Sequence, residues 1–159
     1  MKEWLKDVDD LVLKGQIVMP YTWWVGETGS RFLIALRDHK KIMGSRCPDC
    51  GKVFVPPRKN CGRCFVDMDE WVELGEEGVV EAHSIVRFAY ELQPVKPPFA
   101  LALIKLDGAD VGLLHLVTED LDRLKNGVRV RAVFKDERSG GILDIESFRI
   151  IEPEREAQP

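Results

Sequence analysis

Residues 47–64 read CPDCGKVFVPPRKNCGRC and contain all the cysteines of the 159-residue chain, namely Cys47, Cys50, Cys61 and Cys64. Each Cys-x-x-Cys pair can present two thiolates from one tight turn, and two such turns supply the four sulfurs of a closed tetrahedral zinc site. Gly51, directly after the first pair, is the residue without a Cβ that such a turn favours. The spacing therefore predicts one structural zinc ion held by the four cysteines, with iron in a four-sulfur site as the alternative.

Two other uses of four cysteines fit the sequence less well. Two disulfides would require an oxidising compartment, and nothing from Met1 onward resembles a signal peptide. A single Cys-x-x-Cys can be a redox motif, but two of them separated by ten residues are typical of metal sites. The apolar runs are also too short to span a bilayer. We therefore expect a cytoplasmic protein whose thiols are reduced and bound to a metal.

The formal net charge of −4 conceals an asymmetry along the chain. From Arg31 to Cys64 there are nine Lys or Arg against two Asp or Glu, whereas from Phe65 to Pro159 there are eleven against twenty. The basic charge is therefore concentrated around the cysteines, and the second half of the chain is acidic.

Residues 1–38 are expected to form an N-terminal helical segment. Residues 2–14 have the pattern of an amphipathic helix. Its apolar face comprises Trp4, Leu5, Val8, Leu11 and Val12. Ser30 is a candidate cap for a second helix that continues through Leu36. Between the two, residues 20–26 read PYTWWVG and have no clear period, so they are either an exposed interaction patch or ordinary packing.

The rest of the chain has the pattern of a small β protein. Residues 39–70 are expected to form the metal-binding ribbon, residues 71–152 a barrel and residues 153–159 a flexible tail. Five strand-like runs occupy residues 79–92, 99–106, 111–117, 128–135 and 142–150, with a short capped helix between the third and the fourth. In the last run the alternation slips between Ile145 and Phe148, which indicates a bulge. This is the element order of an oligonucleotide/oligosaccharide-binding (OB) barrel. The predicted fold class is therefore mainly β, with N-terminal helices, a rubredoxin-like zinc ribbon and a five-stranded OB-like barrel.

Two functional classes can be weighed on these residues. An OB barrel that binds nucleic acid needs aromatic side chains and cations on its second and third strands, but residues 99–117 offer only Phe99, Lys105 and His115, and the barrel half is acidic. An independent enzyme would lack a cysteine nucleophile, because the metal occupies all four thiols. His39, His83 and His115 are scattered and lie near no nucleophile motif. We therefore expect little activity from the chain alone, and nucleic-acid binding stays the alternative function.

The motif string also carries a family resemblance. Residues 46–58, RCPDCGKVFVPPR, followed by the second cysteine pair and a Gly-Val-Val strand start at Gly78, resemble a family of small proteins that combine a rubredoxin-like zinc ribbon with an OB-like barrel. This family long carried an unknown-function label. Its members accompany thiolases, an archaeal hydroxymethylglutaryl-CoA synthase and some acyl-CoA hydratases as accessory subunits. Residues 30–42 resemble the branch paired with thiolases, one member of which serves anaerobic toluene degradation.

The resemblance implies a non-catalytic subunit of a thiolase-type acyltransferase complex, in which the catalytic cysteine belongs to the partner. The chain would brace that hetero-oligomeric partner and help to form the entrance for the acyl-CoA substrate. Candidate contacts to the CoA phosphates, or to an acidic surface of the partner, are Lys40, Lys41, Arg58 and Lys59, with a solvated basic face as the alternative. A candidate docking surface for the partner comprises Trp4, Tyr21, Trp23, Trp24, Phe32 and Leu36.

Overall fold

The computed structural model describes residues 3, 12, 13, 15, 19–91, 93 and 95–151. The helix expected over residues 2–14, with Trp4 on its apolar face, lies outside the described residues apart from three positions, and so does the tail expected over residues 153–159. These two expectations stay predictions.

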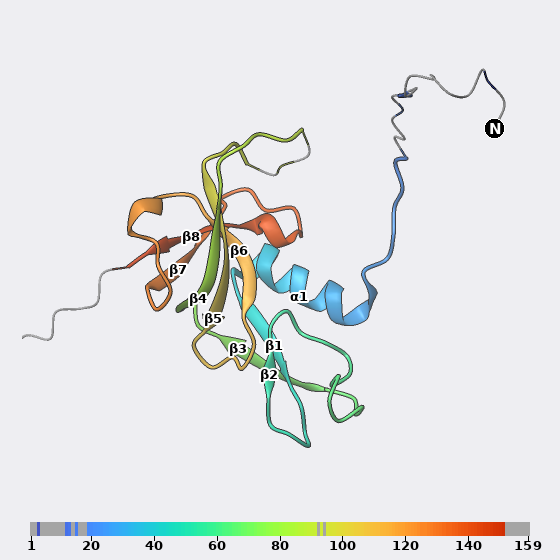
Figure 1. Cartoon of the computed structure of the whole chain (residues 1–159). Coiled ribbons are helices and arrows are strands. Elements are labelled where there is room, and N and C mark those ends of the chain that lie inside the picture. Colours follow the sequence, from blue (N-terminus) through green and yellow to red (C-terminus); the bar gives the residue numbers. More distant parts are fainter. Residues whose placement is uncertain are drawn as a thin grey trace, which may run out of the picture.

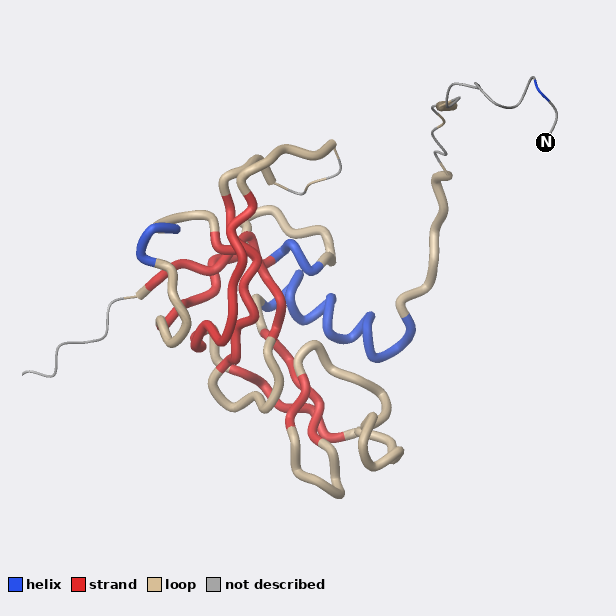
Figure 2. Tube along the Cα trace, in the orientation of Figure 1, coloured by secondary structure: helices blue, strands red, loops and turns tan. Residues whose placement is uncertain are grey.

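The described chain consists of one long helix, a small sheet and a barrel (Figure 1). Helix α1 (Gly26–His39) is followed by a three-stranded antiparallel sheet of order β2-β1-β3, made of β1 (Ile42–Arg46), β2 (Val53–Phe54) and β3 (Glu70–Leu74). Figure 2 shows this sheet extending from one end of the barrel. Residues 71–74 were expected in the barrel, but β3 pairs with β1 along its whole length.

The second half closes into a five-stranded barrel of order β4-β5-β6-β8-β7. The strands are β4 (Glu77–Val86), β5 (Phe99–Leu106), β6 (Leu113–Val117), β7 (Arg129–Phe134) and β8 (Ile145–Ile150). The register between β7 and β8 shifts by one residue, because Val133 pairs with Ser147 whereas Phe134 pairs with Ile145. The OB-like barrel predicted from the strand order is confirmed, and so is the bulge predicted between residues 145 and 148.

Two one-turn 3-10 helices connect the later strands. The first, η2 (Leu121–Arg123), lies where a short capped helix was expected, but it is a single turn without a side-chain cap. The second, η3 (Ile142–Asp144), replaces the first three residues of the last expected strand. The Asp144 carboxylate accepts hydrogen bonds from the backbone N–H groups of Ser139 and Gly140 at 2.9 and 2.8 Å, which fixes the loop before η3.

The helix predicted from Ser30 is confirmed as an element, but its start is wrong. Helix α1 begins at Gly26, and its N-cap is Val25, five residues before the expected cap Ser30; Val25 makes no side-chain cap hydrogen bond. It ends at His39, and the left-handed backbone of the C-cap Lys40 (φ 54°) terminates it. Among the described residues, no helix combines the length and the apolar character needed to cross a membrane.

One hydrophobic core joins all three parts of the fold. Phe32 and Leu36 of α1 are buried together with Ile42 of β1, Leu74 of β3 and the barrel interior. Phe32 and Leu36 were expected on a docking surface, and this expectation is wrong because both side chains are needed to cover the core shared by the helix, the small sheet and the barrel. Helix α1 is therefore an integral part of the fold.

Candidate metal centre

The two cysteine pairs meet at the end of the small sheet. Their four Sγ atoms all lie within 4.8 Å of one another, and the Sγ atoms of Cys50 and Cys61 are 3.9 Å apart. A tetrahedral ion with metal–sulfur bonds of about 2.3 Å separates its ligands by about 3.8 Å. Cys47 and Cys61 are buried, Cys50 and Cys64 are half-buried, and none of the four forms a disulfide. The residues present therefore fit a four-thiolate metal site, as the sequence predicted.

Each pair sits in the same kind of turn, which we call the first knuckle (residues 47–52) and the second knuckle (residues 61–66). In the first, the Gly51 N–H donates to the Cys47 carbonyl at 3.0 Å, and the Cys47 N–H donates to the Lys52 carbonyl at 2.9 Å. In the second, the Phe65 N–H donates to the Cys61 carbonyl at 2.9 Å, and the Cys61 N–H donates to the Val66 carbonyl at 2.9 Å. The two knuckles are thus equivalent in hydrogen bonding, residue for residue.

The thiols of the second knuckle differ in acidity. The backbone N–H groups of Cys64 and Arg63 stabilise the Cys61 thiolate and lower the pKa of that thiol to about 7. Burial, followed by the neighbouring thiols, raises the pKa of the Cys64 thiol to about 12. A bound cation would remove this difference, because coordination requires all four ligands to be thiolates.

A four-thiolate site supplies structure and no Lewis-acid chemistry. All four coordination positions of a tetrahedral ion would be filled by protein sulfur, which leaves no position for a substrate or a water molecule. A second small core lies beneath it, built from Phe54 and Met68 with the buried cysteines. The metal would therefore hold together a part of the chain that has few other apolar contacts.

The four candidate CoA contacts are not gathered at one place. Lys40 and Lys41 precede β1, and the Lys41 ammonium pairs with the Glu73 carboxylate at 2.7 Å. Arg58 is hydrogen-bonded to Ser45 near the other end of β1, about 13 Å along the strand from Lys41. The Arg58 guanidinium lies 5.3 Å from the centre of the Phe54 ring. The structure thus separates Lys40 and Lys41 from Arg58 and Lys59.

Lys59 lines a cavity that sequence reasoning missed. The cavity has a volume of about 460 Å³ and lies between the start of α1 and the ribbon, with Trp24 and Arg31 on one side and Lys59 and Trp71 on the other. The Arg31 guanidinium sits 5.0 Å from the centre of the Trp71 ring, in a cation–π contact. The aromatic residues at 20–26 hinted at this site, but only the fold brings them near Trp71.

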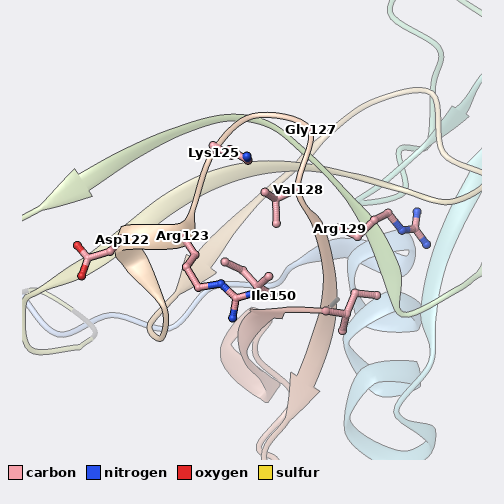
Figure 3. Close-up of a pocket in the computed structure, with 8 residues that line it drawn as sticks. Asp122, Arg123, Lys125, Gly127, Val128, Arg129 and Ile150 are labelled. Atoms are coloured by element: carbon pink, nitrogen blue, oxygen red, sulfur yellow. The ribbon is translucent and has the colours of Figure 1, made fainter. Parts of the chain in front are cut away.

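Another cavity, of about 540 Å³, lies at one end of the barrel (Figure 3). Val128 and Ile150 form its apolar wall, and Arg123 and Lys125 contribute charge. The Arg129 side chain points away from Arg123 and Lys125 in this view, and its guanidinium pairs with Asp107 and Glu77 at 2.7 and 2.9 Å. The lining of this cavity and that of the cavity beside α1 contain neither a histidine nor a cysteine.

The outer face of β5 and β6 carries leucine side chains and the exposed Lys105. Leu103 pairs with Leu114 across the two strands, and both Leu101 and Leu114 are exposed. His115, which was considered as a nucleic-acid contact, is instead buried in the barrel, where its ring packs edge-on against Phe148. The aromatic platforms that single-stranded nucleic acids require are therefore not found on this face.

The aromatic residues before α1 are highly exposed. Tyr21, Trp23 and Trp24 expose 76%, 70% and 80% of their surface, and Met19 exposes 71%. Figure 1 shows the segment before α1 leading away from the barrel. We refer to residues 19–25 as the aromatic segment. Of the two alternatives that the sequence left open for these residues, the structure favours the exposed patch.

Comparisons with known proteins agree with this architecture. Residues 35–69 match the family model of the ChsH2 rubredoxin-like zinc ribbon domain, and residues 71–135 match that of the ChsH2 C-terminal OB-fold domain. Two relatives are described as DUF35 domain-containing scaffold proteins. The one from Methanocaldococcus jannaschii is 26% identical over 67% of this chain and 76% of its own length, and the one from Methanothermobacter thermautotrophicus is 26% identical over 63% and 76%.

Two solved structures share the fold. A DUF35-family protein of unknown function from Sulfolobus solfataricus superposes with a TM-score of 0.58 and 29% identity, over 79% of this chain and 83% of that one. A chain of the Ltp2-ChsH2(DUF35) aldolase superposes with a TM-score of 0.58 and 18% identity, over 79% and 93%, a likeness of fold alone. Since the zinc-ribbon and OB-fold models match consecutive parts of the chain in the order the structure shows, the protein belongs to the ChsH2/DUF35 family of zinc-ribbon and OB-fold proteins.

Proposed function

We propose that this protein is a non-catalytic accessory subunit that docks on a thiolase-type acyl-CoA enzyme and braces it. The description of the two archaeal relatives as scaffold proteins supports the general role. The sequence resemblance to the thiolase-paired branch supports the choice of partner. The cysteine that a thiolase needs would come from the partner, because the four cysteines of this chain form the metal site. The ion held there is zinc, and its role is to fold the ribbon.

The exposed aromatic segment is the observation that carries this proposal. Tyr21, Trp23 and Trp24 together present a large apolar area that the described fold leaves uncovered. Tryptophan and tyrosine are the residue types that most often anchor protein interfaces, since they bury much surface at a small cost in side-chain entropy. A segment of this composition ahead of a folded domain is suited to lie on a partner's surface.

The same segment leads to the cavity beside α1, which Trp24 shares with Lys59. A partner that covers the aromatic segment would therefore also approach Lys59. We propose that Lys59, together with Arg58 on the same turn, contacts the phosphates of the CoA substrate at this junction. Lys41 is neutralised by Glu73 and is a poorer candidate.

The test is co-expression with a thiolase-type catalytic subunit from the same genome. Wild-type protein should co-elute with this subunit, and a triple variant, Tyr21→Ser with Trp23→Ser and Trp24→Ser, should not. The matched control is Phe88→Ser with Tyr90→Ser, which removes two aromatic residues that expose 72% and 65% of their surface on the β4–β5 hairpin. Failure of the wild-type chain to bind the thiolase, or equal binding by the triple variant, would overturn the proposal.

A truncation that tests docking must keep the core residues of α1. A deletion that ends at residue 38 would remove Phe32 and Leu36 and unfold the barrel, so it cannot report on docking. A deletion of residues 1–24 keeps α1 and should leave the thermal transition of the zinc-loaded protein unchanged while abolishing the complex. If this shorter protein still co-elutes with the thiolase, the docking surface lies elsewhere on the molecule.

A further inference from the structure

The second knuckle carries an unusual residue. Phe65 has a φ of +59°, in the left-handed region, and 85% of its surface is exposed. A bulky residue with positive φ is uncommon, because its Cβ crowds the backbone. Phe65 directly follows the metal ligand Cys64, so its position on the protein is fixed by the knuckle.

The first knuckle shows that this strain is avoidable. The equivalent residue there is Gly51, with a φ of +71° and the same hydrogen bond to the first cysteine of its pair. Glycine adopts this conformation without steric cost. The chain therefore uses the favourable residue in one knuckle and an unfavourable one in the other, although the two turns have the same geometry.

Nothing within the described fold compensates for the phenylalanine. Its ring is almost fully exposed, so it gains little burial, and it belongs to neither of the two hydrophobic cores. A strained residue that persists without benefit to the folded chain points to a function outside it.

The residues that directly precede Phe65 are basic, whereas the exposed Asp67 and Asp69 follow it. Arg63 is exposed on the same knuckle, and a guanidinium nitrogen of Arg58 lies 3.9 Å from the position that a Cβ of Gly62 would occupy. Between Arg58 and Phe65 the chain has three cations and no acidic residue, which exceeds the two negative charges of a zinc ion with four thiolates. An aromatic side chain with cations around it complements an apolar pocket that has carboxylates at its rim.

We propose that Phe65 is an anchor residue for the catalytic partner, inserting its ring into an apolar pocket with an acidic rim on that subunit. This inference rests on the proposed function, and it adds a second contact site, at the metal end of the molecule, to the aromatic segment. The zinc site then does more than fold the ribbon, since it also holds the Phe65 ring in a fixed, exposed position.

The decisive variant is Phe65→Gly in the full-length, zinc-loaded chain. Because glycine relieves the strain, the melting temperature of the isolated chain should rise by about 2–4 °C. Because the anchor is lost, the dissociation constant for the thiolase-type subunit should increase about thirtyfold. Phe65→Asn should also raise the melting temperature and weaken the complex, because asparagine is polar and tolerates a positive φ. Phe65→Tyr should retain most of the affinity. A residue with a purely structural role would lower stability and affinity together.

Charge is tested separately. Arg63→Glu should weaken the complex about tenfold and reduce its sensitivity to salt, whereas Lys125→Glu at the barrel cavity should have no effect on binding. Both dissociation constants can be measured by titration calorimetry at two salt concentrations.

The outcomes separate the two proposals. If wild-type chain does not bind the thiolase, the proposed function fails and the anchor role with it. If wild-type chain binds but Phe65→Gly binds equally well, only the anchor role is overturned. Sedimentation of the isolated chain tests whether the Phe65 ring binds a second copy of this chain instead of the partner. If the wild type is a dimer and Phe65→Gly is a monomer, the ring belongs to a contact between two copies, and the anchor role for the thiolase is overturned.

Discussion

The side chain of Ser45 binds both backbone polar groups of Arg58. Its hydroxyl oxygen accepts a hydrogen bond from the Arg58 N–H at 2.9 Å, and the hydroxyl donates to the Arg58 carbonyl at 3.0 Å. Ser45 is buried on β1, so this pair ties the turn that carries Arg58 and Lys59 to the small sheet. This hydroxyl group therefore helps to fix the position of these cations, together with the Met68 N–H, which donates to the Lys59 carbonyl at 2.7 Å.

Replacing Ser45 with alanine should destabilise the protein by about 1–3 kcal/mol, because two backbone groups lose their partner in a buried environment. The melting temperature should fall by several degrees. The matched control is Ser84→Ala on the exposed face of β4, which should leave the transition unchanged. Equal transitions for Ser45→Ala and the wild type would show that water replaces the hydroxyl at no cost.

Purified protein should contain about one equivalent of zinc, and Cys47→Ser or Cys61→Ser should lose both the metal and the ribbon structure, because metal binding and folding of such a site are coupled. Asp49→Ser, between two of the ligands and exposed, should keep the metal. Zinc should also be released as the pH falls, since protons compete for the thiolates. Elemental analysis that finds less than about half an equivalent of zinc or iron would contradict the site.

The barrel should lose stability in mild acid through His115. Its Nε2 lies 3.2 Å from the Ile142 carbonyl, its Nδ1 is buried without a partner, and burial lowers the pKa of the imidazole. In the unfolded chain the pKa is about 6.5, so the unfolded state binds more protons below this pH. The free energy of unfolding should therefore fall as the pH decreases below about 6.5, with a slope of up to about 1.4 kcal/mol per pH unit.

Urea titrations between pH 7.5 and 5.5, a window set around that unperturbed pKa, would measure this slope. His115→Gln keeps a donor for the Ile142 carbonyl and removes the titration, so its stability should depend less on pH. His83→Gln is the control, because His83 is a half-buried histidine hydrogen-bonded to Asn126. Identical pH profiles for His115→Gln and the wild type would exclude His115 as the cause.

Lys59→Glu should raise the KM of the assembled complex for its CoA substrate about tenfold while leaving kcat and the stoichiometry unchanged, if Lys59 contacts the CoA phosphates. Arg58 is a poorer choice for charge reversal, because its guanidinium also packs on Phe54. Lys52→Glu, on the first knuckle and exposed, is the control. Unchanged kinetics with an intact complex would assign Lys59 to a solvated face.

Several features of this protein follow from local sequence. The spacing of Cys47, Cys50, Cys61 and Cys64 predicted the metal site because each Cys-x-x-Cys turn is closed by hydrogen bonds within six residues. The strand alternation predicted the five barrel strands, since alternate side chains of a half-buried strand face the core. The loss of alternation after Ile145 predicted the shifted register with β7 for the same reason.

Other features depend on contacts between distant parts of the chain, and only the tertiary structure decided them. Phe32 and Leu36 were predicted to belong to a docking surface, and only the fold shows that they pack against Ile42 and the barrel. Lys41 and Arg58 read as one basic cluster until β1 separated them and Glu73 paired with Lys41. The sequence alone does not reveal that Phe65 has a positive φ, because that angle is imposed by the knuckle and not by the phenylalanine. The periodicity of apolar residues predicts which face of a helix or strand is apolar. What that face packs against depends on residues far away in the sequence.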